Sequence, residues 1–185
     1  MNSTDKRLKK QDLDLIKKLT GKEIIKIVHD EYIYTNTSFG HINIFLNDDI
    51  YELKCAITPT EYFGSKEDVG ILKFNKVTIN DVKSELKDHK QTEDKISNKL
   101  LKIDIVNEHQ YVNDNKNEYS YDYTKGIILY FEGFEYAFKM SAWFSEIIEI
   151  YKGYNLIEKF NNDDDFNDSF SNIKNKNIKR EVVTV

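Results

Sequence analysis

The stretch 126–150, GIILYFEGFEYAFKMSAWFSEIIEI, constrains the fold more than any other part of the sequence. Both before and after Glu132-Gly133 in the sequence, every second residue belongs to one row of large apolar side chains. This is the pattern of half-buried strands, because successive side chains of a strand point to opposite faces. Gly133 can supply the positive φ of a tight turn. The sequence therefore predicts a β-hairpin with one continuous apolar row, formed by Ile127, Leu129, Phe131, Phe134, Tyr136, Phe138 and Met140.

A second hairpin is predicted over 42–57, with a turn at Asn47-Asp48-Asp49, since Asn and Asp tolerate left-handed backbone conformations. The two hairpins match without gaps at an offset of 85 residues. Either the chain contains two similar units, 22–79 and 101–153, or any two alternating hairpins of this length would align as well. The matched pairs are Ile42 with Ile127, Ile44 with Leu129, Leu46 with Phe131, Tyr51 with Tyr136, Leu53 with Phe138 and Cys55 with Met140.

Two helices are expected beside these strands. In 5–19 the apolar residues recur at helical spacing and Gly21 follows at the place of a C-terminal glycine. The charged segment 80–100 has a sparse apolar row and is expected to be a helix that joins the two halves. The predicted fold class is α+β: a mostly antiparallel β-sheet built from two similar β-hairpin units, with an N-terminal helix and a central connecting helix.

Residues 1–160 are expected to form a single globular domain. Residues 161–185 combine low hydrophobicity with high charge, which favours a flexible C-terminal tail. The valines near the end, Val182, Val183 and Val185, leave an added edge strand as the alternative.

The amino-acid composition indicates which class of partner the chain can bind. The net charge is −5, from 27 basic and 32 acidic residues, so the excess of cations that favours nucleic-acid binding is lacking. An acidic chain is better suited to bind a basic protein surface. The alternative is that the negative charge only keeps the protein soluble. Cys55 is the single cysteine, so an internal disulfide and a cysteine-based zinc site are excluded, and we expect a small core residue there. With no secretory signal or membrane span in view, a cytoplasmic location is expected.

No motif for a phosphate-binding loop, a serine nucleophile or a dinucleotide site is present, and we assign no catalytic residue, cofactor or metal ligand. The histidines are His29, His41, His89 and His109. His29, followed by Asp30 and Glu31, would join His109 and Glu108 if the two halves superpose. Such a cluster is a metal-site alternative.

Two loops are the candidates for binding, TPTEYFGSKEDVG over 58–70 and SAWFSE over 141–146. Each places aromatic residues beside acids, and Tyr and Trp are enriched at binding hot spots. The alternative is that these aromatics close one end of the fold. The candidate partner-binding residues are Tyr62, Phe63, Glu67, Asp68, Trp143, Phe144 and Glu146.

These features favour a non-enzymatic acidic protein that binds and inhibits a protein partner. Toxin-immunity proteins and phage-encoded inhibitors of bacterial defence nucleases are analogous in class. The alternatives are a metal-dependent hydrolase that uses the histidines and acids, and a self-associating structural or accessory protein that forms homo-oligomers.

Overall fold

The computed structural model describes residues 2–32, 34–86 and 91–185. Within these residues the helical elements are α1 (Lys10–Lys17), the 3-10 helix η1 (Leu156–Phe160) and α2 (Asp164–Ser169). None of the helices in these ranges is long and apolar enough to cross a membrane. The strands are β1 (Asn2–Lys6), β2 (Glu23–Tyr32), β3 (Tyr34–Phe45), β4 (Ile50–Tyr62), β5 (Ser65–Val77), β6 (Gln91–Lys99), β7 (Lys102–Asn113), β8 (Glu118–Phe131), β9 (Phe134–Met140), β10 (Ile147–Gly153) and β11 (Asn175–Thr184).

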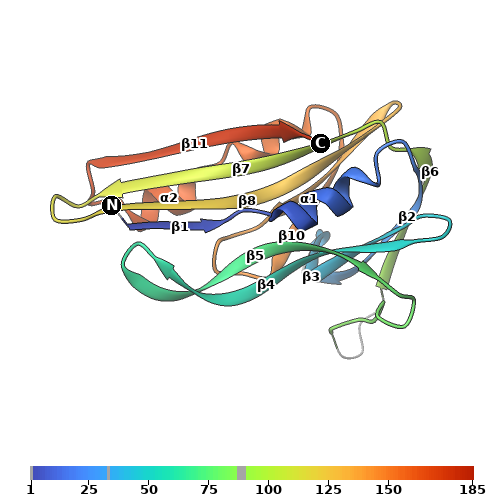
Figure 1. Cartoon of the computed structure of the whole chain (residues 1–185), viewed down its shortest axis with the longest axis horizontal. Coiled ribbons are helices and arrows are strands. Elements are labelled where there is room, and N and C mark those ends of the chain that lie inside the picture. The colour runs from blue at the N-terminus through green and yellow to red at the C-terminus, as the bar shows by residue number, and fades with distance from the viewer. Residues whose placement is uncertain (1, 33, 87–90) are drawn as a thin grey trace.

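The strands form one sheet with the order β11-β7-β8-β9-β10-β3-β2-β6, from which β4 and β5 branch at β3. All pairs are antiparallel except that of β1 with β8. The sheet folds over, so that β7, β8 and β11 lie opposite β4 and β5 (Figure 1). The main core fills the space between these layers. The α+β class with a mostly antiparallel sheet is thereby confirmed.

Each half of the sheet has the same strand order. β2 to β5 run as an antiparallel meander, and β6 returns to pair with β2. β7 to β10 form a second meander, and β11 returns to pair with β7. The halves join where β10 pairs with β3.

Both predicted hairpins are present. Phe45 pairs with Ile50 at the first turn, and Phe131 pairs with Phe134 at the second. The residues on which the hairpin prediction depends are in the core, and Leu53 and Phe138 are fully buried. A buried Leu or Phe contributes about 2 kcal/mol by the area that it removes from water.

The N-terminal helix is shorter than the expected 5–19. Residues Asn2–Lys6 form β1, which pairs in parallel with β8, and α1 starts at Lys10. Helix α1 lies between β8 and β5 (Figure 1). Asp12 on α1 accepts a hydrogen bond from the backbone N–H of Phe74 in β5 at 3.1 Å, which fixes the helix to this strand.

The predicted central helix over 80–100 is wrong. Residues 79–81 form a turn, 85–86 a bend, and Gln91–Lys99 form β6, which pairs with β2. Ile96 is the one apolar residue of β6, and the strand lies at an edge of the sheet, so the apolar alternation that marks a half-buried strand is missing from its sequence. His89 lies outside the described residues.

The C-terminal residues 161–185, expected as a flexible tail, contain α2 and β11. β11 pairs with β7 over its whole length, from Asn175 with Asn113 to Thr184 with Asp104. This is the edge-strand alternative of the sequence. The segment that leads to β11 covers the outer face of β7, β8 and β9, where a second, smaller core is formed by Val106, Ile128, Ala137, Leu156 and Phe160.

Candidate partner-binding site

The two predicted binding segments meet in space, although 58–70 is not a loop: β4 runs to Tyr62 and β5 starts at Ser65, so that Phe63 and Gly64 alone connect them. The ring of Tyr62 stacks on the indole of Trp143, with centroids 4.5 Å apart and planes 15° apart. Phe63 packs edge-on against Tyr62 at 4.5 Å. Phe170, which follows α2, packs against Phe63 at 4.7 Å. We call Tyr62, Phe63, Trp143, Phe144, Phe166 and Phe170 the aromatic cluster.

Backbone hydrogen bonds hold the loop 141–146 against the edges of two strands. The N–H of Gly70 in β5 donates to the carbonyl oxygen of Trp143 at 2.6 Å, and the N–H of Gly40 in β3 donates to that of Glu146 at 3.1 Å. A Cβ on Gly70 would lie 2.5 Å from the carbonyl oxygen of Ser145. Only a glycine lets the loop approach β5 this closely.

The β4–β5 turn carries the other half of the cluster. Tyr62 pairs with Ser65, so Phe63 and Gly64 are the two turn residues, with φ of 49° and 86°. Positive φ at both positions is the type I′ arrangement that suits a two-residue hairpin. It costs a non-glycine residue about 1 kcal/mol. The contacts of the Phe63 ring with Tyr62 and Phe170 offset that strain.

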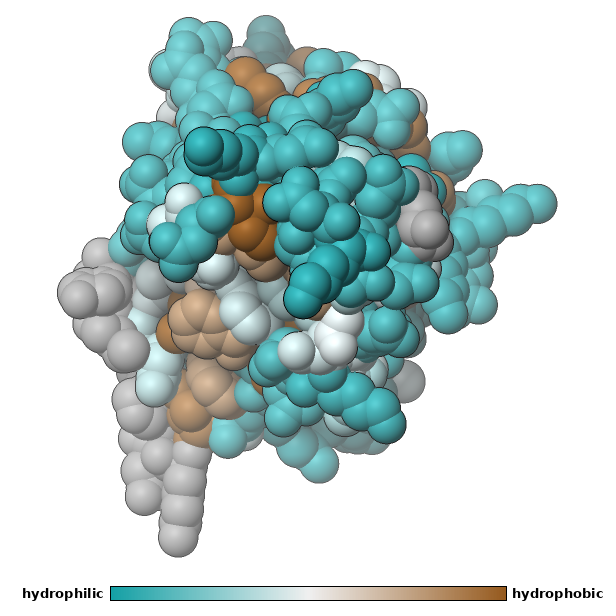
Figure 2. Space-filling view, turned by 90° about the vertical axis from the view of Figure 1, so that its left-hand side faces the viewer, coloured by the Kyte–Doolittle hydropathy of each residue, from teal (hydrophilic) through white to brown (hydrophobic). Residues whose placement is uncertain are grey.

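The cluster is part core and part surface. Tyr62 is buried and Trp143 is half-buried, but Phe144 is 60% exposed although it packs edge-on against Trp143 at 5.2 Å. Figure 2 looks onto the end of the molecule that carries the β4–β5 turn and α2, and a small hydrophobic area there is bordered by hydrophilic side chains. The alternative was that these aromatic residues close one end of the fold. The burial of Tyr62 agrees with it, whereas the exposure of Phe144 does not.

The predicted acidic residues differ in the face of the sheet that they occupy and in their exposure. Glu67 and Asp68 are consecutive residues of β5, so they point to opposite faces. Glu67 is half-buried and lies opposite the buried Thr60, whereas Asp68 is exposed. Glu146 is half-buried. The acids that accompany Phe166 and Phe170 in the cluster are not among the candidates from the sequence, because 161–185 is predicted to be a flexible tail. They are Asp163, Asp164, Asp165 and Asp168.

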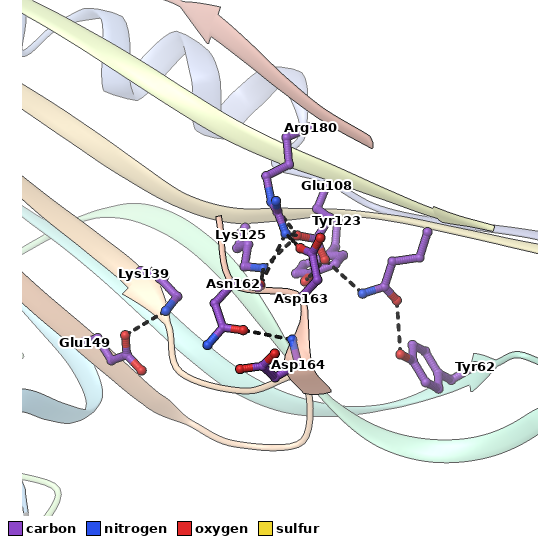
Figure 3. Close-up of polar contacts among 11 residues, drawn as sticks. Tyr62, Glu108, Tyr123, Lys125, Lys139, Glu149, Asn162, Asp163, Asp164 and Arg180 are labelled. Carbon is purple, nitrogen blue, oxygen red and sulfur yellow. Dashed lines mark hydrogen bonds and ion pairs between the residues drawn. The ribbon is translucent and has the colours of Figure 1, made fainter. Parts of the chain in front are cut away.

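A buried ionic network lies beside the cluster (Figure 3). At its centre is Glu108 of β7, which is 1% exposed. Its carboxylate accepts hydrogen bonds from Lys125 Nζ at 2.6 Å and from Arg180 Nε at 2.9 Å. Tyr123 Oη donates to the other oxygen at 2.7 Å. Lys125 reaches this position because it is the extra residue of a bulge between β7 and β8.

The charge of Glu108 is well compensated. Burial alone raises the pKa of a carboxyl, but Lys125 and the hydrogen bonds from Tyr123 and Gln110 outweigh burial here and leave the pKa of Glu108 below its ordinary value. Burial lowers the pKa of Lys125 despite the attraction of Glu108. Arg180 also pairs with Asp163, so β11 and the segment before α2 are both fixed to Glu108.

A relay of hydrogen bonds joins the network to the aromatic cluster. Tyr62 Oη donates to Gln110 Oε1 at 3.0 Å, and Gln110 Nε2 donates to Glu108 Oε1 at 2.9 Å. A cavity of about 230 Å³ lies between the network and the cluster, with Trp143 and Phe166 in its wall. The two groups of residues thus form one site.

The metal-site alternative finds no support in the described part of the chain. His29 lies in β2 and His109 in β7, and the structure does not bring them together with Glu108 in a group that could hold a metal ion among the described residues. His109 instead contacts Asp122, with Nδ1 and Oδ1 2.9 Å apart. Buried His41 lies between Asp30 and Glu85 at 4.0 and 3.6 Å. Within residues 2–32, 34–86 and 91–185, no group of three or more His, Cys, Asp or Glu side chains is placed to hold a metal ion.

Cys55 is a buried core residue. Burial raises the pKa of its thiol to about 12, so a reactive thiolate is not available at neutral pH. Comparison of the chain with protein-family models, with curated proteins and with solved structures finds no match.

Proposed function

We propose that this chain is a non-enzymatic protein that binds and inhibits a protein partner through the end of the molecule that carries the aromatic cluster. In this proposal Phe144 is the anchor, Trp143 packs beside it, and the acids of α2 with Glu67 form the rim. An exposed aromatic residue surrounded by polar groups is the arrangement of a binding hot spot.

The observation that carries this proposal is the 60% exposure of Phe144 on a loop that backbone hydrogen bonds fix to β3 and β5. A rigid anchor loses little conformational freedom on binding, and such preorganisation increases affinity. Elsewhere in the described residues, exposed large apolar side chains such as Ile79 and Tyr154 have no aromatic cluster beneath them.

Charge favours a basic partner. The net charge is −5, and α2 with its N-cap contributes the four acids beside the cluster. Complementary charges accelerate association and exclude wrong partners. A nuclease has such a basic surface where it binds nucleic-acid phosphates. Covering that surface would inhibit it, as a toxin-immunity protein or a phage-encoded inhibitor of a bacterial defence nuclease does.

The test is a binding titration with candidate nucleases, measured for the wild-type chain, for Phe144→Ala and for the double variant Asp164→Lys/Asp165→Lys. We expect Phe144→Ala to weaken binding by about 2 kcal/mol or more, as at hot spots. The double variant should slow association and reduce its salt dependence. Tyr154→Ala is the control, because Tyr154 is 71% exposed and lies outside the cluster. Equal binding by all four proteins would contradict the proposal.

We further propose that the two halves of the sheet are copies of one unit. The shared strand order and the gapless pairing of Ile42 with Ile127 support this. Asp30 in β2 and Glu108 in β7 are equivalent buried acids beneath the segment that precedes the returning strand. Superposing β2–β6 on β7–β11 should place Leu53 on Phe138. A best fit shifted by a residue would contradict the proposal.

A further inference from the structure

The cavity beside Trp143 opens between α2 and the loop 141–146. Its inner end is formed by buried groups, namely Glu108, Tyr123 and Lys125, and its outer end includes the exposed Asp165 and Asn162. Its volume of about 230 Å³ is below the roughly 300–1,000 Å³ of typical sites for small-molecule ligands. A single long side chain of another protein is of suitable size.

The walls carry an excess of negative charge. Four carboxylates line the cavity, from Glu108, Glu149, Asp163 and Asp165, against the two ammonium groups of Lys125 and Lys139. Arg180 adds one positive charge from behind, through its contacts with Glu108 and Asp163. One negative charge remains without compensation, so the cavity favours a cation.

The carboxylate without a compensating positive charge from the described residues is that of Asp165. Glu108 pairs with Lys125, Glu149 pairs with Lys139 at 2.9 Å, and Asp163 pairs with Arg180. Asp165 has no ion pair with any residue in the described part of the chain. It lines the outer end of the cavity together with Phe166, the next residue of α2.

We propose that this cavity receives an arginine side chain of the partner. The proposal rests on the proposed function and names the chemistry of the group recognised. The guanidinium pairs with Asp165, as planar guanidinium groups pair with carboxylates. The indole of Trp143 lies in the wall of the cavity and provides an aromatic surface of the kind that attracts arginine. Phe144 then covers the partner surface outside the cavity.

The only tryptophan of the chain is Trp143, so its fluorescence reports on the cavity. The full-length protein is titrated with N-acetyl-arginine methylamide and, separately, with its neutral citrulline analogue. We expect a saturable change with the arginine compound alone. Asp165→Asn should raise the dissociation constant about tenfold, the value of one charge-assisted hydrogen bond. Glu158→Gln is the matched control, because it also removes one carboxylate charge, and Glu158 is an exposed residue of η1 that does not line the cavity.

Several results would overturn the inference: no saturable change, equal binding of the citrulline analogue, or unchanged affinity in Asp165→Asn. The proposed function is tested separately, by partner binding of Phe144→Ala, whereas the inference is tested by the arginine titrations of the wild type and of Asp165→Asn. If partner binding depends on Phe144 while arginine does not bind, the inference fails and the proposed function stands. If arginine binds and Phe144→Ala leaves partner binding intact, the cavity inference stands and the proposed function fails.

Discussion

Tyr62 and Trp143 stack with their ring centroids 4.5 Å apart, although they belong to different halves of the chain. The contact joins the β4–β5 turn to the loop between β9 and β10. It places Phe144 at the surface and, through Gln110, connects the aromatic cluster to the buried Glu108. Changes in either the loop or the ionic network should therefore affect the same site.

Gly70→Ala should displace the loop 141–146. The added Cβ would meet the Ser145 carbonyl oxygen at 2.5 Å, and overpacking of this kind costs about 1–3 kcal/mol. We expect a lower free energy of unfolding in urea and an altered fluorescence spectrum of Trp143. Gly153→Ala is the control, because a Cβ there has its nearest contact at an ordinary 3.7 Å. A Gly70→Ala protein with wild-type stability and spectrum would show that the loop is not held as described.

Glu108→Gln should be strongly destabilising. The substitution leaves Lys125 and Arg180 without their buried counterion, and breaking a buried pair from one side costs about 3–5 kcal/mol. Adding Lys125→Met should recover part of this loss, because the buried ammonium is then removed as well. Urea unfolding of the single and double variants measures the coupling. Strictly additive effects would contradict the network.

Stability should fall as the pH falls from 7.5 to 5. Burial lowers the pKa of His29 below its ordinary value of 6.5, despite the nearby Asp94, Glu31 and Asp30. The unfolded chain then binds a proton that the folded chain does not, so acidification below about 6.5 favours unfolding. His29→Gln should flatten the dependence of the unfolding free energy on pH in this window. Identical slopes for the variant and the wild type would contradict this account.

The parts of the fold that the sequence predicted are those with a one-sided apolar pattern. Leu53 and Phe138 alternate with polar neighbours because one face of their strands meets the core. The strand β6 is not predicted by the sequence because it lies at a sheet edge and Ile96 is its one apolar residue. Its pairing with β2 depends on a free strand edge that only the assembled sheet provides.

The aromatic cluster was predicted in part for the same reason. Aromatic residues beside acids marked Tyr62 and Trp143, which do come together. The sequence does not single out Asp165, since its position at the cavity depends on Phe166 and Phe170 packing against Phe63, a contact between distant segments. The sequence marked Glu108 only as a metal-ligand alternative, because nothing local shows that Arg180 would reach it from β11.

The central claim is that Phe144 anchors a partner protein. The most direct measurement is a calorimetric titration of a nuclease that the wild-type chain inhibits, repeated with Phe144→Ala after equal thermal stability of the two proteins has been verified. The account predicts that the dissociation constant rises about thirtyfold or more, as expected for a hot-spot residue, and that inhibition weakens in parallel. An unchanged dissociation constant with unchanged inhibition would contradict it.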